Sequence, residues 1–212
     1  MKNEYYIQSY CHLKNGRAIL SGERINIEDP GSLNEFLKSI YQYLQIDYPK
    51  FFKMDEVCKL AFIATELALK DFPLQEISEG ETGIVLANSS STLETDRKHQ
   101  ESIREEQNYF PSPAVFVYTL PNITIGEITI RHKLKGENTF FISEKYDTAF
   151  LSKYVNLLLQ NNKANKVLTG WVEYGSEGYD GFIYLAGKDK KGLSLEHHKE
   201  NIDRLYNSLP SV

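Results

Sequence analysis

Apolar and polar positions along the chain alternate between an extended pattern and a helical pattern. Residues 5–13 have the extended pattern, and a second extended run from Ala18 to Ile27 follows the Asn15-Gly16 turn signal. We expect these two runs to pair as a hairpin. Ser32 then has the position and side chain of a helix N-cap, and the apolar residues after it recur at helical spacing as far as Leu44.

A second helix and a buried strand follow. From about Asp55 to Asp71 the apolar face is so broad that we expect this helix to be covered on more than one side. The run Thr82–Asn88 is continuously apolar, which is typical of a strand in a parallel sheet with both faces covered. The serine-rich turn after it lacks the glycines and the lysine of a phosphate-binding loop, so we interpret it as a capped helix start.

The stretch from Gly136 to Glu173 predicts a strand, a tight polar turn, a helix and another strand. The first strand is Thr139–Ser143, and the second is Lys166–Val172. A strand that turns directly into a helix presents one side chain at its apex, beside free helix N–H groups. In many α/β enzymes this apex carries the nucleophile, and here it is Lys145.

The remaining segments complete an α/β pattern. We predict a charged helix from Leu93 to about Gln107, a helix from Pro121 through Gly126, a strand Phe182–Ala186 and a terminal helix from Ser194 to Leu209. Strands that alternate with helices favour a three-layer α/β fold, in which helices cover both faces of a mainly parallel sheet. The 212 residues are enough for one large domain.

Composition narrows the function classes. The net charge of −5 argues against non-specific nucleic-acid binding, which requires clustered lysine and arginine. The N-terminus lacks a signal-peptide core and no apolar run approaches a membrane span, so we expect a cytoplasmic protein. Cys11 and Cys58 form neither a disulfide framework nor a metal-ligand spacing. We therefore expect no metal and no cofactor.

Four segments carry a resemblance to a known family. They are KFFKMDEVCKLA (50–61), TGIVLANSSSTLET (82–95), PSPAVFVYTLPNITIGEITIRHKLKGEN (111–138) and NKANKVLTGWVE (162–173). Their order and spacing resemble the N-terminal half of β-ketoacyl synthases, in the thiolase-like superfamily, most clearly over 50–186. The resemblance implies a three-layer thiolase-like half fold and a single ketosynthase N-terminal-like domain over 1–212. Family members extend acyl groups carried on acyl carrier protein or coenzyme A.

The departures from the family concern its catalytic residues. Family members have a cysteine nine residues after the glycine of a Gly-Pro pair, and counting from Gly136 places that position at Lys145. The two catalytic histidines of the family lie in its C-terminal half, which this chain does not reach. His197 and His198 match no family motif, and we expect both to be solvated surface residues. Without a thiolate and paired histidines, the ordinary condensation has neither its nucleophile nor its enolate stabilisers.

Two functions follow from the resemblance. The first is a catalytically inactive, chain-length-factor-like accessory subunit for fatty acid, polyketide or aryl-polyene synthesis. It would form a homodimer, or a heterodimer with a full-length ketosynthase, and acyl carrier protein is a further partner that the resemblance implies. The second is an acyltransferase or hydrolase that uses acyl carrier protein or acyl-CoA, with altered chemistry at Lys145 or Ser143. We favour the first because no base is recognisable for Ser143.

The resemblance also implies an interface. In the family, the segments that correspond to residues 111–158 form the dimer interface and the acyl tunnel. The interface and tunnel candidates here are Phe116, Asn122, Phe140, Ile142, Phe150 and Tyr154. In the helix after Lys145, helical spacing places Ser152, Lys153, Asn156 and Gln160 on one narrow polar stripe. We expect the rest of this helix to be buried.

Overall fold

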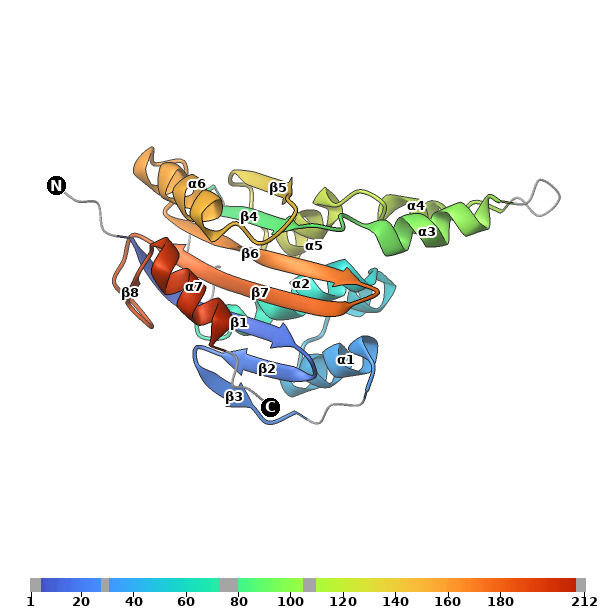
Figure 1. Cartoon of the computed structure of the whole chain (residues 1–212), viewed down its shortest axis with the longest axis horizontal. Coiled ribbons are helices and arrows are strands. Elements are labelled where there is room, and N and C mark those ends of the chain that lie inside the picture. Colours follow the sequence, from blue (N-terminus) through green and yellow to red (C-terminus); the bar gives the residue numbers. More distant parts are fainter. Residues whose placement is uncertain (1–4, 28–30, 73–79, 105–109, 209–212) are drawn as a thin grey trace.

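The computed structural model describes residues 5–27, 31–72, 80–104 and 110–208 (Figure 1). The strands in this part of the chain are β1 (Tyr6–Lys14), β2 (Arg17–Leu20), β3 (Glu23–Ile25), β4 (Thr82–Asn88), β5 (Asn138–Ile142), β6 (Lys166–Gly175), β7 (Gly178–Gly187) and β8 (Leu195–Glu196). The helices are α1 (Leu33–Tyr43), the 3-10 helix η1 (Pro49–Lys53), α2 (Glu56–Ala68), α3 (Leu93–Ser102), α4 (Pro113–Val117), α5 (Asn122–His132), α6 (Thr148–Gln160) and α7 (Lys199–Asn207).

All of these strands belong to one sheet, in the order β3-β2-β1-β7-β6-β4-β5, with β8 paired to β1. Only β4 with β5 and β4 with β6 are parallel, and the other neighbours are antiparallel. The sheet is therefore mixed, whereas the sequence predicted a mainly parallel one. The reason lies in the connections: β1 to β3 and β6 to β7 are joined by short turns, which allow only antiparallel pairing, while helical crossovers join β4, β5 and β6.

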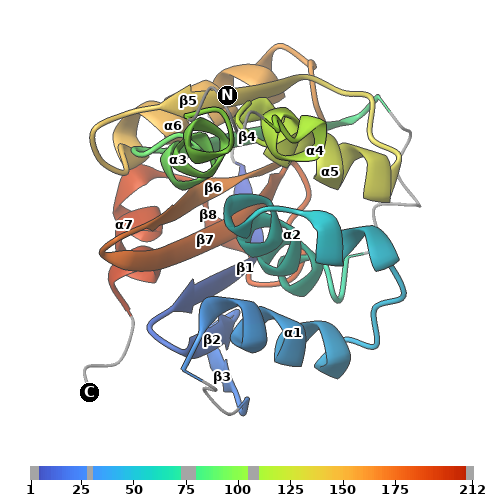
Figure 2. The ribbon, with the colours of Figure 1, turned by 90° about the vertical axis from the view of Figure 1, so that its right-hand side faces the viewer.

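Helices cover both faces of the sheet, which confirms the predicted α/β architecture (Figure 2). On one face α1, α2 and α5 pack on residues such as Leu86, Leu168 and Ile183. On the other face α6 and α7 pack on residues such as Val167 and Phe182. Helices α3 and α4 lie beyond the ends of the strands, at the right of Figure 1.

Local signals in the sequence place most element ends correctly. Asn15 and Gly16 both have positive φ, at 50° and 69°, and turn β1 into β2 as predicted. The hydroxyl of Ser32 accepts a hydrogen bond from the backbone N–H of Glu35 and caps α1. Asp55 caps α2 in the same way, by accepting from the N–H of Cys58. These caps satisfy N–H groups that the helices leave free.

Two predicted segments differ in detail. The extended run from Ala18 to Ile27 is divided into β2 and β3 by a turn at Ser21 and Gly22, both of positive φ. Helix α5 continues past Gly126 to His132, because that glycine has open space around it and no steric reason to end the helix.

The other differences lie in the charged and C-terminal segments. Helix α3 ends at Ser102, and the rest of the helix predicted to about Gln107 includes residues outside the described ranges. Helix α4 was not predicted. The predicted terminal helix is divided into β8 and α7, and its last residue, Leu209, lies outside the described residues.

Substitution Gly170→Ala should destabilise the fold strongly. A Cβ atom at this position of β6 would lie 1.9 Å from the carbonyl oxygen of Phe182 in β7, so the two paired strands would have to separate. We expect a loss of more than about 2 kcal/mol in the free energy of unfolding, measured by urea denaturation. Gly126→Ala is the matched control: it lies in a helix with free space, and we expect a gain of about 0.5–1 kcal/mol. Equal effects of the two substitutions would contradict this packing.

Candidate functional site

The predicted apex lies where three parallel strands end side by side. The register places Asn88 of β4 beside Ile142 of β5, and Ala87 beside Trp171 of β6. The segments that follow these positions therefore meet at one edge of the sheet. They carry the serine-rich turn after β4, the apex after β5 and Glu173 near the end of β6.

Lys145 is exposed at this apex. Within the described part of the chain its ammonium group forms no ion pair and no hydrogen bond, so it is not held by the acidic residues beside it. The hydroxyl of Ser143 donates to the backbone carbonyl of Lys145 at 3.0 Å, not to a base. Asp147 caps α6 by accepting from the N–H of Phe150 at 2.9 Å. The apex therefore has the exposed amine of Lys145 and a Ser143 hydroxyl that bonds the adjacent backbone. The Asp147 carboxylate already accepts a hydrogen bond from one N–H group at the start of α6.

Tyr146 anchors the apex to the sheet. Its ring packs against Trp171, Phe182 and Tyr206, with ring centroids 5.7, 5.9 and 4.9 Å away. Its hydroxyl is buried without a hydrogen-bond partner among the described residues, and burial raises the pKa of this phenol well above its ordinary value. Because Tyr146 is directed inward, the neighbouring Lys145 is directed to solvent.

Glu173 holds the serine-rich turn. One carboxylate oxygen accepts hydrogen bonds from the N–H of Ser89 at 2.7 Å, the hydroxyl of Ser89 at 2.7 Å and the N–H of Ser90 at 3.2 Å. The side chain of Asn88 bonds the backbone of Ser91 in both directions. The N–H groups that a phosphate would need are therefore occupied. The turn starts a helix, as predicted. The residue at the N-cap position, Thr92, donates its hydroxyl to the backbone carbonyl of Thr119, so no side chain caps the helix.

A buried charged cluster lies on the α7 side of the sheet. The carboxylate of Asp180 is bonded by His12 Nε2 at 2.7 Å, Lys14 Nζ at 2.6 Å and the hydroxyl of Tyr206 at 2.7 Å. The Tyr206 ring stacks on His12 with centroids 5.2 Å apart. Burial alone would raise the pKa of Asp180, but the hydrogen bonds from His12 and Lys14 outweigh it and the pKa is lowered. The only local pattern that points to this cluster is the same-face spacing of His12 and Lys14 on one strand.

The expectation that both adjacent histidines are solvated is wrong for His197. This side chain is 5% exposed, and its ring nitrogens bond Asn156 of α6 at 2.7 Å and the hydroxyl of Tyr184 at 3.1 Å. His198 is the N-cap of α7 and is only partly buried. Burial, with a smaller effect of neighbouring His198, lowers the pKa of His197 to about 3. The histidine is therefore neutral near pH 7, and it attaches the segment before α7 to α6.

The predicted polar stripe of α6 is also partly wrong. Ser152 is buried at 5% exposure, and the solvent-facing row contains Phe150 and Leu157 as well as Lys153 and Gln160. Ser152 lies one turn from Thr148 and from Asn156, which bond Asp203 of α7 and His197 before it, and its own hydroxyl bonds the carbonyl of Ala149. Two large apolar side chains, Phe150 and Leu157, are left in solvent.

The interface and tunnel candidates lie on four elements, α4, α5, β5 and α6. Phe116 is exposed on α4, and Asn122 is exposed at the start of α5. Phe140 and Ile142 lie on β5, the first partly buried and the second 52% exposed. Tyr154 of α6 and exposed Phe150 both contact Phe141 of β5. The structure brings Phe150 and Tyr154 together and leaves Phe116 on the separate α3–α4 part.

Within the described ranges, no group of three or more histidine, cysteine or acidic side chains has a geometry that suits a metal ion. Cys11 and Cys58 are buried free thiols, and burial raises the pKa of both. No helix of the described residues has the length and apolarity to span a membrane.

Comparison with known proteins connects this fold to ketosynthases. No family model and no curated protein sequence matches the chain. Among solved structures, the ishigamide ketosynthase/chain length factor matches at TM-score 0.61 and 17% identity, over 87% of this chain and 62% of that one. A β-ketoacyl synthase from Burkholderia phymatum STM815 matches at TM-score 0.63 and 14% identity, over 96% and 61%.

A third structure is the ketosynthase ApeO in complex with its chain length factor ApeC from Xenorhabdus doucetiae. It matches at TM-score 0.60 and 14% identity, over 88% of this chain and 79% of that one. The chain thus has the thiolase-like fold of ketosynthases, as the sequence motifs predicted. It spans about three-fifths of the ishigamide and Burkholderia chains.

Stability should fall as the pH is lowered below about 6.5, because of His197. In the unfolded chain this histidine has its ordinary pKa of about 6.5, whereas in the fold it is about 3. Between these values the unfolded state binds more protons, so stability rises with pH. We expect the free energy of unfolding to be about 1.4 kcal/mol lower at pH 5.5 than at pH 7.5 from this group.

The matched control for this pH dependence is His197→Gln, which retains an amide for hydrogen bonding but does not titrate. Urea denaturation of both proteins at the two pH values isolates the contribution of His197. The variant should lose most of the pH-dependent difference, even if it is less stable at both values. An unchanged difference would show that His197 is not the group responsible.

Proposed function

We propose that this chain is a catalytically inactive ketosynthase-like protein that acts as an accessory subunit. It would form one ketosynthase N-terminal-like domain over residues 1–212, and bind a full-length ketosynthase or a second copy of itself. The observation that supports this most is the free edge of the sheet at β5 and the apolar side chains exposed around it.

Strand β5 is an uncharged edge strand. Its sequence, Asn-Thr-Phe-Phe-Ile, contains no charged residue and no proline. Natural proteins use charged residues and proline to keep edge strands from pairing with other chains. The N–H of Ser143 bonds the carbonyl of Asn88, and the carbonyl of Glu137 accepts from Ile84. By alternation, the odd-numbered residues of β5 bond β4, and the N–H groups of Phe140 and Ile142 point toward the free edge. They are available to another strand.

Exposed apolar side chains are concentrated in the segment of the chain that contains β5. Of the twelve large apolar side chains exposed among the described residues, seven lie between residues 111 and 158. They are Phe116, Val117, Leu120, Ile130, Ile142, Phe150 and Leu157. Of these, Ile142 lies on β5 and Phe150 packs on Phe141 of β5, and exposed apolar side chains that adjoin one another are typical of a protein interface.

The apex supports a role without catalysis. The position of the family nucleophile carries Lys145, whose amine is exposed to solvent and is not enclosed in the apolar pocket that activates nucleophilic lysines. Acylation of this amine would form an amide, from which the acyl group is not readily transferred. Chain length factors accompany ketosynthases in two of the matching structures, which is consistent with a role of this kind, in fatty acid, polyketide or aryl-polyene synthesis.

The isolated chain should neither transfer nor hydrolyse an acyl group. Incubation with a radiolabelled acyl thioester of acyl carrier protein should leave the protein unlabelled and release no free acid above the uncatalysed rate. The Ser143 hydroxyl bonds a carbonyl oxygen, so it lacks an activating base. Label on Lys145 or Ser143 that disappears in Lys145→Ala or Ser143→Ala would favour the acyltransferase or hydrolase alternative.

Substitution Phe150→Glu should weaken the assembly by at least about tenfold in dissociation constant. This ring is 44% exposed beside Phe141 of β5, so a carboxylate there would be desolvated when a partner covers the edge. Light scattering after size exclusion gives the assembly mass for the chain alone, and titration calorimetry gives its affinity for a full-length ketosynthase.

The matched control is Phe52→Glu. This ring is 54% exposed and packs on the buried ring of Phe51, but it belongs to η1 and not to β5 or α6. It should leave the assembly unchanged. The proposal would be contradicted if the unmodified chain stayed monomeric and bound no ketosynthase, or if both substitutions weakened binding equally.

A further inference from the structure

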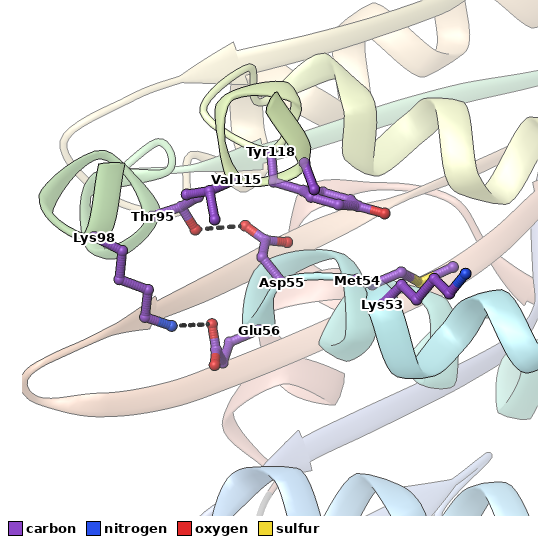
Figure 3. A pocket seen from close by; sticks show the side chains of 9 residues that line it. Lys53, Met54, Asp55, Glu56, Thr95, Lys98, Val115 and Tyr118 are labelled. Carbon is purple, nitrogen blue, oxygen red and sulfur yellow. Dashed lines mark hydrogen bonds and ion pairs between the residues drawn. The ribbon is translucent and has the colours of Figure 1, made fainter. Parts of the chain in front are cut away.

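A cleft separates the N-terminus of α2 from the α3–α4 part of the chain (Figure 3). Its volume is about 180 Å³. Three segments line it: residues 53–56 around the start of α2, Thr95 and Lys98 of α3, and Ala114, Val115 and Tyr118 of the α4 segment. The cleft is distinct from the apex at Lys145 and from the free edge at β5, whose residues do not line it.

The polar groups of this cleft are already paired with one another. The two carboxylate oxygens of Asp55 accept from the N–H of Cys58 at 2.9 Å and the hydroxyl of Thr95 at 2.8 Å. Lys98 forms an ion pair with Glu56 at 2.9 Å, and Figure 3 shows both links crossing the cleft. The Tyr118 hydroxyl donates to Glu127 at 3.1 Å. A charged ligand would have to displace one of these partners.

The charges of the lining also cancel. Lys53 and Lys98 are balanced by Asp55 and Glu56, so the cleft favours neither an anion nor a cation. The rest of the lining is apolar or aromatic and consists of Met54, Ala114, Val115 and the ring of Tyr118. Apolar surface with internally satisfied polar groups gains most from an apolar ligand, which replaces water and requires no new hydrogen bond.

We propose that this cleft binds one small, uncharged apolar group, with the size of a single aromatic ring or a short branched alkyl chain. The volume suits such a group, since an engineered cavity of about 150 Å³ holds benzene. Because the ligand would touch both the start of α2 and α4, it would add an apolar link between them, beside the two polar side-chain links that join the start of α2 to α3. This binding does not depend on a partner subunit.

Three probes of similar size and different charge test the inference: toluene, benzoate and benzylamine. Amide resonances of isotopically labelled full-length protein report binding at Thr95, Lys98, Val115 and Tyr118. We expect toluene to shift these resonances in a saturable way, and the two charged probes to bind at least about tenfold more weakly. No saturable shift with toluene, or equal or tighter binding of a charged probe, would overturn the proposal.

Two tryptophan substitutions on the same helix locate the site. Val115→Trp places a large side chain in the cleft and should weaken toluene binding at least about tenfold. Val117→Trp is the matched control, at a position that is 44% exposed and does not line the cleft, and it should bind toluene like the unmodified protein. Circular dichroism checks that both variants fold, and a misfolded Val115→Trp would be replaced by Val115→Leu, with the same expected direction. Unchanged binding in the folded cleft variant would contradict the assignment.

Discussion

The pairing of β4 with parallel neighbours on both sides is the constraint on which the rest of the structure depends. Every residue of Thr82–Asn88 is buried, so this strand can exist only inside a sheet that is covered on both faces. Its two parallel partners end at the same edge, which brings the apex at Lys145, the serine-rich turn and Glu173 together. Because β4 has only β5 on its outer side, the same pairing leaves β5 as the free edge.

The face of the sheet behind the apex is closed by the chain itself. Tyr206 of α7 bonds Asp180 and packs on Tyr146, and Asp203 accepts the Thr148 hydroxyl at the start of α6. His197 adds a bond to α6 further along the helix. The apex is thus supported from behind by an aromatic and charged cluster, while its own side chain faces solvent. This arrangement suits a rigid surface better than a reactive centre.

Local sequence signals predicted most helices and strands, but they did not predict which distant strands pair. The turn at Asn15-Gly16, the cap at Ser32 and the apolar run of β4 each act within a few residues, so the sequence reveals them directly. Whether two strands are parallel depends on which segments become neighbours in the sheet. The prediction of a mainly parallel sheet was wrong for this reason. The family motifs predicted the ketosynthase fold, because they fix the order and spacing of several elements together.

The candidate site was less predictable. Glu173 bonds Ser89 across 84 positions of sequence, and His12 bonds Asp180 across 168, so neither contact leaves a local pattern. The burial of His197 follows from the position of α7, which no periodicity in its charged sequence could specify. The position of Lys145 at the apex was predictable, since a strand and a helix adjoin it directly.

The central claim is that another chain covers the free edge of β5, and amide hydrogen exchange measures this most directly. In the isolated monomer, Phe141 should be protected by β4 while Phe140 and Ile142, which point outward, exchange rapidly. In the assembly with a ketosynthase or a second copy, all three amides should exchange slowly. Rapid exchange at Phe140 and Ile142 in a verified assembly, with Phe141 still protected, would contradict the account.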